Sequence, residues 1–525
     1  MKNTLQPLVY GLLLAIGLTG GFFISNYTHD GSIISSSSDD KIQEVIRYAF
    51  DNYVDSVSRE QLVDDAISGM LEKLDPHSVY IPKQEFGDVN DQLNGSFEGI
   101  GVQFRIESDT IVVISPVPNG PSATKGILPG DRIVKVDGKT VAGTGIENDD
   151  VLKLLKGPKG SKVVLGIYRK GVKGINDYEI IRDVIPLNSL DAAFMLNNST
   201  GYIRLNAFTA TTYDEFSKAI TQLLNTGMSN LILDLRDNGG GFLNAAVDIA
   251  DDFLPEGNTI VYTKGLHRKE KFYKSYARGL FEKGKLVILI DEFSASASEI
   301  LAGSIQDNDR GLIIGRRSFG KGLVQEQIEL KDGSAFRLTV ARYYTPSGRC
   351  IQRPYDGGAE EYYLDFYKSL VLNDSAAWIY NTEKHDSLVY STRLGRAVYG
   401  GGGIFPDSVV LHDYSFTAAF QTAFFGGGKV FGEVFRYIDT ERNNLKRNYP
   451  DFGQFYSRFQ VPSELMGSIY AKSGINESLV GVQDAMLARV FVKANIAREL
   501  FGIDAYYRVI MPEDNLIKKA LQVLR

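Results

Sequence analysis

The chain has 525 residues, enough for three or four domains that each bury a core of their own. Hydrophobic residues make up 43% and charged residues 23%, and the formal net charge is −7. This composition indicates an acidic folded protein and disfavours a nucleic-acid-binding surface, which is basic. The single cysteine, Cys350, excludes an internal disulfide framework and a cysteine-ligated metal cluster.

The N-terminus begins with an apolar segment. Residues 8–24, LVYGLLLAIGLTGGFFI, contain no charge; Lys2 precedes them and Asp30 follows them. This run is near the lower length limit for a membrane-spanning helix, and the placement of charge predicts a cytoplasmic N-terminus and an exported body. No A-x-A signal follows, which favours a retained anchor; a cleaved signal would release the body into the periplasm. We therefore assign residues 1–28 to an anchor or signal segment and 29–39 to a flexible serine-rich tether.

Two different patterns follow the tether. Apolar residues recur at helical spacing between 40 and 75, so residues 40–88 are predicted to be an N-terminal helical region. Short alternating strands separated by glycine turns then occupy residues 89–185, with VDGK at 136–139 as a hairpin turn. This second region is predicted to be mostly β.

The rest of the chain is predicted to be α/β and then helical. Residues 186–412 alternate strands and helices, which predicts a largely parallel sheet covered on both faces. An irregular, tyrosine-rich insertion is expected at about 353–399, and residues 413–525 form a helical C-terminal region. The fold class is therefore a multidomain α/β protein.

Three serines occupy alternate positions in FSASASEI, residues 293–300, where a predicted strand turns into a helix. A helix N-terminus offers free N–H groups, so this junction suits a nucleophile. Ser296 and Glu299 also have the spacing of a capping box, which makes Ser296 an N-cap. From this segment alone a helix cap is the simpler interpretation, and a nucleophile would need a base from elsewhere in the chain.

Glycines accumulate in two further segments. RDNGGG, residues 236–241, forms a second strand-to-helix turn that can supply an oxyanion hole or a phosphate cradle, although a flexible turn is the plain alternative. GRRSFGK, residues 315–321, matches the start of a phosphate-binding loop. Position 322 is Gly where that loop needs Ser or Thr, and a strand pattern follows instead of a helix, so we reject a nucleotide site.

Lys321 in the last of these segments suits another role. A lysine in a dry site loses its proton more readily and can act as general base for a serine. Gln325 lies four residues on, so in a strand it would face the same side and could orient the amine. A solvated surface lysine is the alternative.

Together these motifs resemble those of the C-terminal processing (tail-specific) serine peptidases. The counterparts of the family's motifs are DLRDNGGG at 234–241, SASASE at 294–299, GKGLVQ at 320–325 and YYTPSGRCIQ at 343–352. The resemblance covers about residues 40–410 and implies a ClpP/crotonase-like peptidase core of βαβ units into which the 89–185 region is inserted.

The resemblance implies a serine endopeptidase with a Ser–Lys dyad, no cofactor and no metal. It assigns roles to six residues: Ser296 as nucleophile, Lys321 as general base, Gln325 as assisting residue, and the N–H groups of Ala297 and of Gly240 or Gly241 as the oxyanion hole. Cys350 is a competing nucleophile without evident activation in its turn.

Residues 89–185 resemble a PDZ domain, through GSFEGIGVQF and residues 115–141. PDZ domains add a peptide strand to a sheet edge and bind its terminal carboxylate with backbone N–H groups. Arg169, on the last predicted strand, matches a basic position that responds to bound substrate in some family members. The carboxylate-binding loop would consist of Gly99, Ile100, Gly101 and Val102.

The resemblance, the net charge and the N-terminal segment together imply partners and a location. We expect protein or peptide substrates bound by their C-termini, a membrane attachment that leaves the body on the periplasmic side, no nucleic acid, and a homodimer through the helical regions. The family's G-I-x-P-D segment begins only at Gly403 here, so gating and oligomer contacts of shorter relatives do not transfer. Two other classes stay open, a non-catalytic PDZ adaptor on a peptidase fold and a crotonase-like acyl-transfer enzyme.

Overall fold

The computed structural model describes residues 38–276, 278–371, 388–411 and 416–525. The chain divides into a unit that ends at Met70 and a larger unit from Leu71 to Arg525. The first unit contains α2 (Ser38–Asn52) and most of α3 (Arg59–Glu72). Helix α2 includes the last two residues of the predicted tether, which are helical and not part of a flexible linker.

The predicted anchor and most of the tether lie outside the described residues. Across the ranges given above, none of the helices combines the length and the apolar character needed to cross a membrane. The anchor therefore stays a prediction from the sequence.

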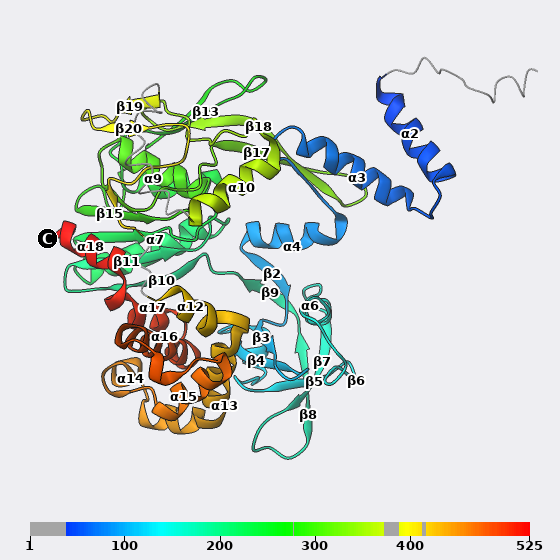
Figure 1. Cartoon of the computed structure of the whole chain (residues 1–525), viewed down its shortest axis with the longest axis vertical. Coiled ribbons are helices and arrows are strands. Elements are labelled where there is room, and N and C mark those ends of the chain that lie inside the picture. Colours follow the sequence, from blue (N-terminus) through cyan, green and yellow to red (C-terminus); the bar gives the residue numbers. More distant parts are fainter. Residues whose placement is uncertain (1–37, 277, 372–387, 412–415) are drawn as a thin grey trace, which may run out of the picture. The chain divides into compact units, whose positions relative to one another are not determined.

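A six-stranded sheet forms the centre of the peptidase-like region (Figure 1). Its strands lie in the order β10 (Leu190–Met195), β11 (Thr200–Leu205), β12 (Asn230–Asp234), β15 (Lys285–Ile290), β16 (Leu312–Gly315) and β21 (Ser408–Val409). Neighbouring strands from β11 onward pair in parallel, and β10 pairs antiparallel with β11. The alternation of strands and helices in the sequence thus produces the predicted, largely parallel sheet.

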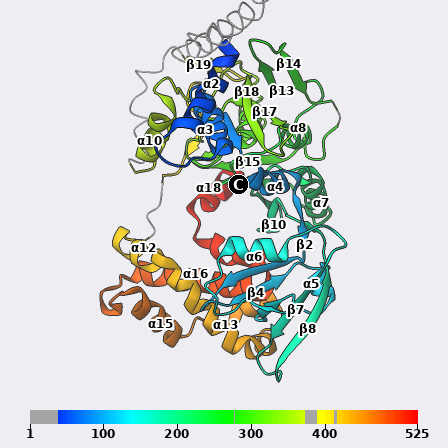
Figure 2. The same cartoon turned by 90° about the vertical axis from the view of Figure 1, so that its right-hand side faces the viewer.

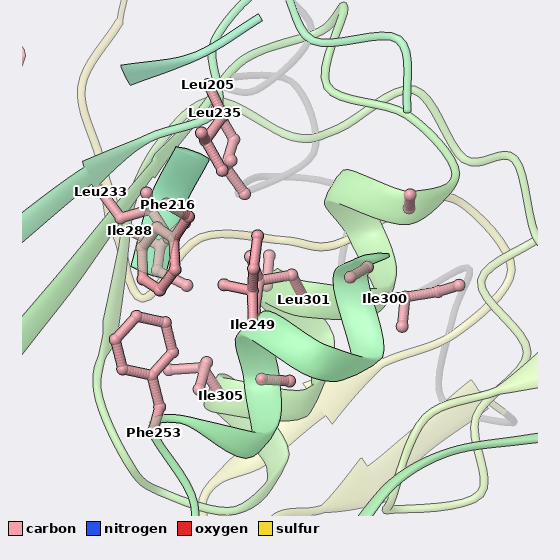
Figure 3. Packing of buried hydrophobic residues seen from close by; sticks show 14 of the residues in the cluster. Leu205, Phe216, Leu233, Leu235, Ile249, Phe253, Ile288, Ile300, Leu301 and Ile305 are labelled. Atoms are coloured by element: carbon pink, nitrogen blue, oxygen red, sulfur yellow. The ribbon is translucent and has the colours of Figure 1, made fainter. Parts of the chain in front are cut away.

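Successive residues of each strand point to opposite faces of this sheet. On β15, Ile288 joins the largest cluster of buried residues, whereas Leu289 joins a second cluster. Figure 3 shows the larger cluster, in which Phe216 lies close to Leu233. Three helices contribute to it: α7 (Thr212–Asn225), α8 (Leu243–Asp251) and α9 (Ala297–Asp307).

The starts of α8 and α9 are brought together by this topology. Helix α8 follows β12 and α9 follows β15, and these two strands are parallel neighbours. Parallel neighbours end at the same edge of a sheet, so the glycine turn before α8 and the serine turn before α9 meet there. This edge is where a ligand is expected in an open α/β sheet.

The C-terminal helix covers the other face of the sheet (Figures 1 and 2). Apolar residues of α18 (Asn515–Leu524) pack with Ile232, Val287 and Leu289 of the strands. The C-terminal region is therefore not independent of the sheet. The sequence patterns did not predict this contact, because an amphipathic helix does not specify which surface it covers.

A second sheet contains the strand that follows Lys321. Its strands lie in the order β1 (Val79–Ile81), β18 (Ala335–Tyr344), β13 (Thr259–Lys264) and β14 (Lys271–Lys274), with β17 (Leu323–Glu329) also paired to β18. A strand follows Lys321, as predicted, where a phosphate-binding loop would open a helix.

The predicted PDZ region is a separate sheet with β3 at one edge. Asp137 and Gly138 join β5 to β6 with φ angles of 48° and 79°, the left-handed values that a type I′ hairpin requires. Strands β2 (Ser96–Gly99) and β9 (Asp183–Pro186) pair antiparallel where the chain enters and leaves. The other elements are β3 (Val102–Ile106), β4 (Ile111–Pro116), α5 (Pro121–Thr124), β5 (Arg132–Val136), β6 (Lys139–Thr140), α6 (Asn148–Leu155), β7 (Lys162–Tyr168) and β8 (Ile175–Ile181).

The insertion was predicted to be irregular, and this prediction is wrong for most of its described residues. Helix α10 (Gly358–Val371) occupies the first part, and β19 (Val389–Ser391) and β20 (Ala397–Tyr399) form a hairpin in the last part. Tyr362 and Phe366 of α10 are buried, with ring centroids 6.0 and 4.8 Å from that of Phe319. The tyrosine-rich pattern therefore reflects a helix packed beside the 315–321 segment.

The remaining C-terminal helices form a bundle with its own core. Its aromatic residues stack inside it; the rings of Phe420 and Phe424, for example, are 5.2 Å apart. The abundance of Phe and Tyr is thus explained by core packing. The helices are α12 (Ala418–Phe425), α13 (Lys429–Asn448), α14 (Phe452–Arg458), α15 (Ser463–Ser473), α16 (Val482–Phe501) and α17 (Ile503–Ile510).

Candidate active site

One cavity of about 880 Å³ brings the three sequence motifs together. Its wall combines the glycine turn after β12, the start of α9, the loop before β17 and part of α4 (Lys83–Asn94). The predicted site residues that line it are Gly240, Gly241, Ser296, Lys321 and Gln325. The sixth, Ala297, is buried and begins α9 directly after Ser296.

The three alternate serines have different surroundings. The hydroxyl of Ser294 donates to the carbonyl of Leu235 at 2.8 Å, and that of Ser298 donates to the carbonyl of Asn238 at 2.9 Å. Both serines are fully buried, so their hydroxyls hold neighbouring backbone in place. Ser296 is the one of the three that lines the cavity.

Ser296 also has an unusual backbone conformation. Its φ is 56° and its ψ is −111°, a region that residues with a side chain rarely adopt. An ordinary N-cap has extended backbone angles and carries no such strain. The sharp turn from strand to helix, with a strained serine at its tip, is the geometry of a nucleophile elbow. The cap interpretation alone does not account for it.

Lys321 lies at the cavity wall, where protein surrounds most of its amine. It is largely buried, and this burial, together with the nearby charge of Arg337, lowers the pKa of its amine below the ordinary value for lysine. Its Nζ donates to Oε1 of Gln325 at 2.9 Å, and Nε2 of Gln325 donates to the carbonyl of His77. A neutral amine that donates one N–H in this way keeps its lone pair for another partner.

The contact between Lys321 and Gln325 was expected from their spacing of four residues. Lys321 lies two residues before β17, and the register shift between Val324 and Gln325 leaves out Val340 of β18, so no extra residue interrupts the alternation along β17.

Glu299 is a central residue of the site that sequence reasoning treated only as a capping partner. Its buried carboxylate accepts the N–H of Ser296 at 2.8 Å and the N–H of Lys321 at 2.9 Å. It also accepts the Ser318 hydroxyl at 2.5 Å and the Gly320 N–H at 2.7 Å. Burial raises its pKa to about 7, and these four hydrogen bonds oppose the rise. One carboxylate therefore joins the serine turn to the lysine loop.

The glycine turn lies directly against Ser296. A Cβ atom on Gly240, whose φ is 98°, would lie 2.8 Å from Cβ of Ser296 and 2.9 Å from the backbone nitrogen of Ala297. The N–H of Gly240 is already donated to Oδ1 of Asn238 at 2.9 Å. Within the described part of the chain, the N–H groups of Gly241 and Ala297 have no hydrogen-bond partner. Two free donors beside a candidate nucleophile suit an oxyanion.

Asp291 connects the glycine turn to the serine turn. Its Oδ1 accepts the N–H of Asp237 at 3.0 Å and the N–H of Ser294 at 3.1 Å. Burial raises the pKa of this carboxyl to about 6. The two turns are thus held together by a side chain that the sequence motifs did not single out.

His77 was not among the predicted site residues. Its backbone N–H donates to Oδ1 of Asp75 at 2.8 Å, and its ring Nε2 lies 3.2 Å from the hydroxyl of Tyr362 on α10. Burial and the charge of Lys321 lower its pKa to about 4, so the ring is neutral near pH 7. His77 contributes to the site through its backbone carbonyl, which accepts a hydrogen bond from the side-chain amide of Gln325. The D-P-H-S turn was the signal that could have indicated it.

Cys350 is less suited than Ser296 to act as the nucleophile. Burial raises the pKa of the Cys350 thiol, which reduces its thiolate fraction, and Cys350 does not line the cavity. Among the residues that the structure describes, no group of three or more His, Cys, Asp or Glu side chains is arranged to hold a metal ion.

The predicted carboxylate-binding loop lies where β2 ends and β3 begins. Gly101 has a φ of 70°, and the carbonyl of Ile100 accepts both the N–H and the hydroxyl of Ser122, at 3.1 and 2.6 Å. Gly99 is the last residue of β2 and Val102 the first of β3. The loop is therefore fixed next to the edge strand of the sheet, to which a peptide strand could add.

Arg169 lies just beyond β7 and not on the last strand of the sheet, because β8 follows. Its guanidinium donates to both carboxylate oxygens of Asp131, each at 2.6 Å. Asp131 is buried, with 1% of its surface exposed. Arg169 is therefore already paired with a carboxylate inside the domain.

Comparisons with known proteins identify families over several parts of the chain. Residues 199–359 match peptidase family S41, residues 99–174 match a PDZ domain, and residues 25–85 match the N-terminal domain of the activating protease CtpB. Residues 428–502 match a family of unknown function.

Curated relatives are similar to more than half of this chain. The carboxy-terminal-processing protease of Bartonella bacilliformis is 38% identical over 305 residues, which cover 57% of this chain and 69% of the relative. The carboxy-terminal processing protease CtpB of Bacillus subtilis is 35% identical over 318 residues, covering 60% and 65%. The solved structure of a photosystem II D1 C-terminal processing protease is 30% identical, covers 60% of this chain and 91% of that one, and has a TM-score of 0.34.

Proposed function

The chain belongs to the carboxy-terminal processing proteases of peptidase family S41, and from that premise we propose that it is a serine endopeptidase with a Ser–Lys dyad. Ser296 attacks the peptide carbonyl, and the neutral amine of Lys321 takes its proton. Gln325 orients the amine, and the N–H groups of Ala297 and Gly241 stabilise the oxyanion. The strained backbone of Ser296 at the cavity wall is the observation that carries this proposal.

The chemistry follows from the surroundings of each group. A buried lysine with a lowered pKa has a larger neutral fraction near pH 7, and only the neutral amine can accept a proton. The proton then passes to the amine of the leaving peptide, after which water repeats the attack on the acyl-serine. Neither step needs a residue beyond the dyad and its donors.

We also propose that substrates are bound by their C-termini and that the body of the protein works outside the cytoplasm. The first part is supported by the PDZ match and by the edge position of β3. The second is supported by the apolar segment at residues 8–24 and the charges around it. The two alternative classes, an adaptor and an acyl-transfer enzyme, have no comparable observation in their favour. Cleavage of casein or of a tailed peptide separates them from a peptidase.

The first prediction concerns Ser296. We expect Ser296→Ala to abolish turnover and to change the free energy of unfolding by only about 1 kcal/mol, the cost of a lost cap. Cleavage of a tailed peptide and urea unfolding measure the two effects. Ser294→Ala and Ser298→Ala are the controls and should retain turnover, because their hydroxyls bind backbone carbonyls. A Ser296→Ala enzyme that still cleaves the peptide would remove Ser296 from the mechanism.

The second prediction concerns cofactors and thiols. Since the proposed dyad needs no metal and Cys350 is not a member of it, peptide cleavage should persist at about its original rate after treatment with a chelator or a thiol-alkylating reagent. Loss of activity on chelation that zinc restores would place the protein in another mechanistic class.

The third prediction concerns recognition of C-termini. Amidation removes the carboxylate of a substrate and its charge-assisted hydrogen bonds, each worth about 1.5–3 kcal/mol. We therefore expect KM to rise about ten- to hundred-fold for an amidated peptide, with a smaller change in kcat. Steady-state kinetics on matched free-acid and amidated peptides measure this. Equal kinetic constants for both would mean that the PDZ domain does not select substrates by their C-termini.

A further inference from the structure

Tyr343, near the end of β18, touches both members of the proposed dyad. Its side chain is buried in the main hydrophobic cluster, with 1% of its surface exposed, and it also forms part of the cavity wall. Its hydroxyl donates to the carbonyl oxygen of Lys321 at 2.5 Å and lies 3.1 Å from the carbonyl oxygen of Ser296. A single hydroxyl thus binds the backbone of both residues.

Glu299 binds the other side of the same two residues. Its carboxylate accepts the N–H of Ser296 and the N–H of Lys321. The single proton of the Tyr343 hydroxyl lies between their two carbonyl oxygens, with the shorter contact to that of Lys321. Ser296 begins a helix and Lys321 precedes a strand of another sheet, so no regular hydrogen-bond ladder fixes their separation. Glu299 and Tyr343 therefore bind the backbones of Ser296 and Lys321 from two sides.

We propose that Tyr343 is a positioning residue for peptide cleavage, whose hydroxyl sets the separation between Ser296 and Lys321. This inference rests on the Ser–Lys mechanism proposed above. A nucleophile and a base must lie within hydrogen-bond reach, and a displacement of about 1 Å can cost roughly a hundredfold in rate. The strained turn at Ser296 needs such a contact, because strain persists only where surrounding structure enforces it.

The hydroxyl of Tyr343 is suited to this role across the working pH range. Burial, and next to it the charge of Glu299, raises the pKa of Tyr343 well above its ordinary value, so the group remains a hydrogen-bond donor. Without this donor the Lys321 loop can move away from Ser296, and water can reach the amine. Better solvation of the ammonium form would return the lysine pKa toward about 10.4.

The test compares Tyr343→Phe with Tyr344→Phe in the full-length chain. The first change removes only the hydroxyl and keeps the ring in the core. Tyr344 is the matched control, because it is the next residue of β18, faces the opposite side and stacks on Tyr262 with ring centroids 5.0 Å apart. Cleavage of a tailed peptide is measured from pH 6 to 10 and expressed per folded molecule, counted by near-ultraviolet circular dichroism.

For Tyr343→Phe we expect kcat to fall about ten- to hundred-fold, KM to stay within about twofold, and the rise of rate with pH to move to higher pH. Tyr344→Phe should match the wild type in all three. A Tyr343→Phe enzyme with the wild-type kcat and pH profile per folded molecule would overturn the inference. So would a loss of activity that follows the loss of folded protein while the pH profile stays in place, since that is a packing effect only.

Failure of the underlying mechanism would look different. If Lys321→Ala retained turnover, the Ser–Lys proposal itself would fall. If Lys321→Ala is inactive and Tyr343→Phe behaves as wild type, the mechanism stands and only the positioning role is lost.

Discussion

Lys321→Arg is expected to be as inactive as Lys321→Ala, with single-turnover rates lower by roughly 10⁴- to 10⁶-fold, the range seen when a member of a catalytic unit is removed. Arginine keeps the positive charge, but its guanidinium stays protonated at every accessible pH and cannot accept the proton of Ser296. The same substitution at Lys331, an exposed lysine in the turn after β17, is the control and should have no effect.

The pH dependence of the wild-type rate should have a defined sign. The active form of Lys321 is the neutral amine, so the rate rises with pH through a pKa that burial lowers below about 10.4. Glu299, with a pKa of about 7, adds to the loss at acid pH, since its ionised form accepts the N–H groups of the site. Single-turnover cleavage measured from pH 6 to 10 shows the effects of both ionisations, that of Lys321 and that of Glu299, on the rate.

Gln325→Ala should have a smaller effect, a fall of about ten- to hundred-fold, because it orients the amine without receiving the proton. Near-wild-type cleavage by Lys321→Arg between pH 6 and 10 would show that the site needs a cation. The dyad would then have to be abandoned, whatever the result for Gln325.

Asp234→Ala should give the largest loss of stability, about 3–5 kcal/mol in the free energy of unfolding. Asp234 is fully buried and accepts hydrogen bonds from Tyr202 at 2.7 Å, Arg204 at 3.1 Å and Arg236 at 2.6 Å. Removing the carboxylate takes from two largely buried guanidinium groups the partner that they share. Arg204 keeps Asp237 at 2.9 Å, but the loss is still far more costly than that of an exposed ion pair. Arg236 also pairs with Asp514 at 2.7 Å, so the loss extends to the start of α18.

Urea unfolding monitored by circular dichroism measures this effect. Asp183→Ala, which breaks an exposed pair with Lys159, is the control and should leave the unfolding midpoint unchanged. Equal midpoints for Asp234→Ala and Asp183→Ala would show that the buried network contributes no more than a surface pair.

The contribution of Asp234 to the free energy of unfolding should decrease as the pH falls into the acid range. Burial alone would raise the pKa of Asp234, but the charges of Arg236 and Arg204 hold it well below its ordinary value. A carboxyl with a depressed pKa stabilises the folded state above its unfolded pKa of about 3.9, and this stabilisation is lost as the pH falls toward the depressed value. The difference between wild type and Asp234→Ala should therefore be constant from about pH 8 to 5 and shrink in acid.

Local patterns in the sequence determined much of this protein. The alternation of strands and helices predicted the parallel sheet, and Asp137 and Gly138 predicted a hairpin, because both depend on residues close together in the chain. The four motifs predicted the family. Ser296 and Glu299 predicted the helix start, since a capping box is a contact between residues three apart.

Tertiary structure decided which of these residues act together. The pairing of β12 with β15 brings the glycine turn to the serine turn. Glu299, Tyr343 and a backbone hydrogen bond from the Phe319 N–H to the Ser294 carbonyl at 3.0 Å join the serine turn to the lysine loop. The choice among the three serines was likewise made by tertiary contacts, which bury the hydroxyls of Ser294 and Ser298. Helix α18 packs on the far face of the sheet, and Tyr362 of α10 contacts His77. The sequences of these two helices contain no signal that predicts either contact. An apolar or acidic side chain shows that it will be buried or paired, but its partner is fixed by contacts between segments that are distant in the chain.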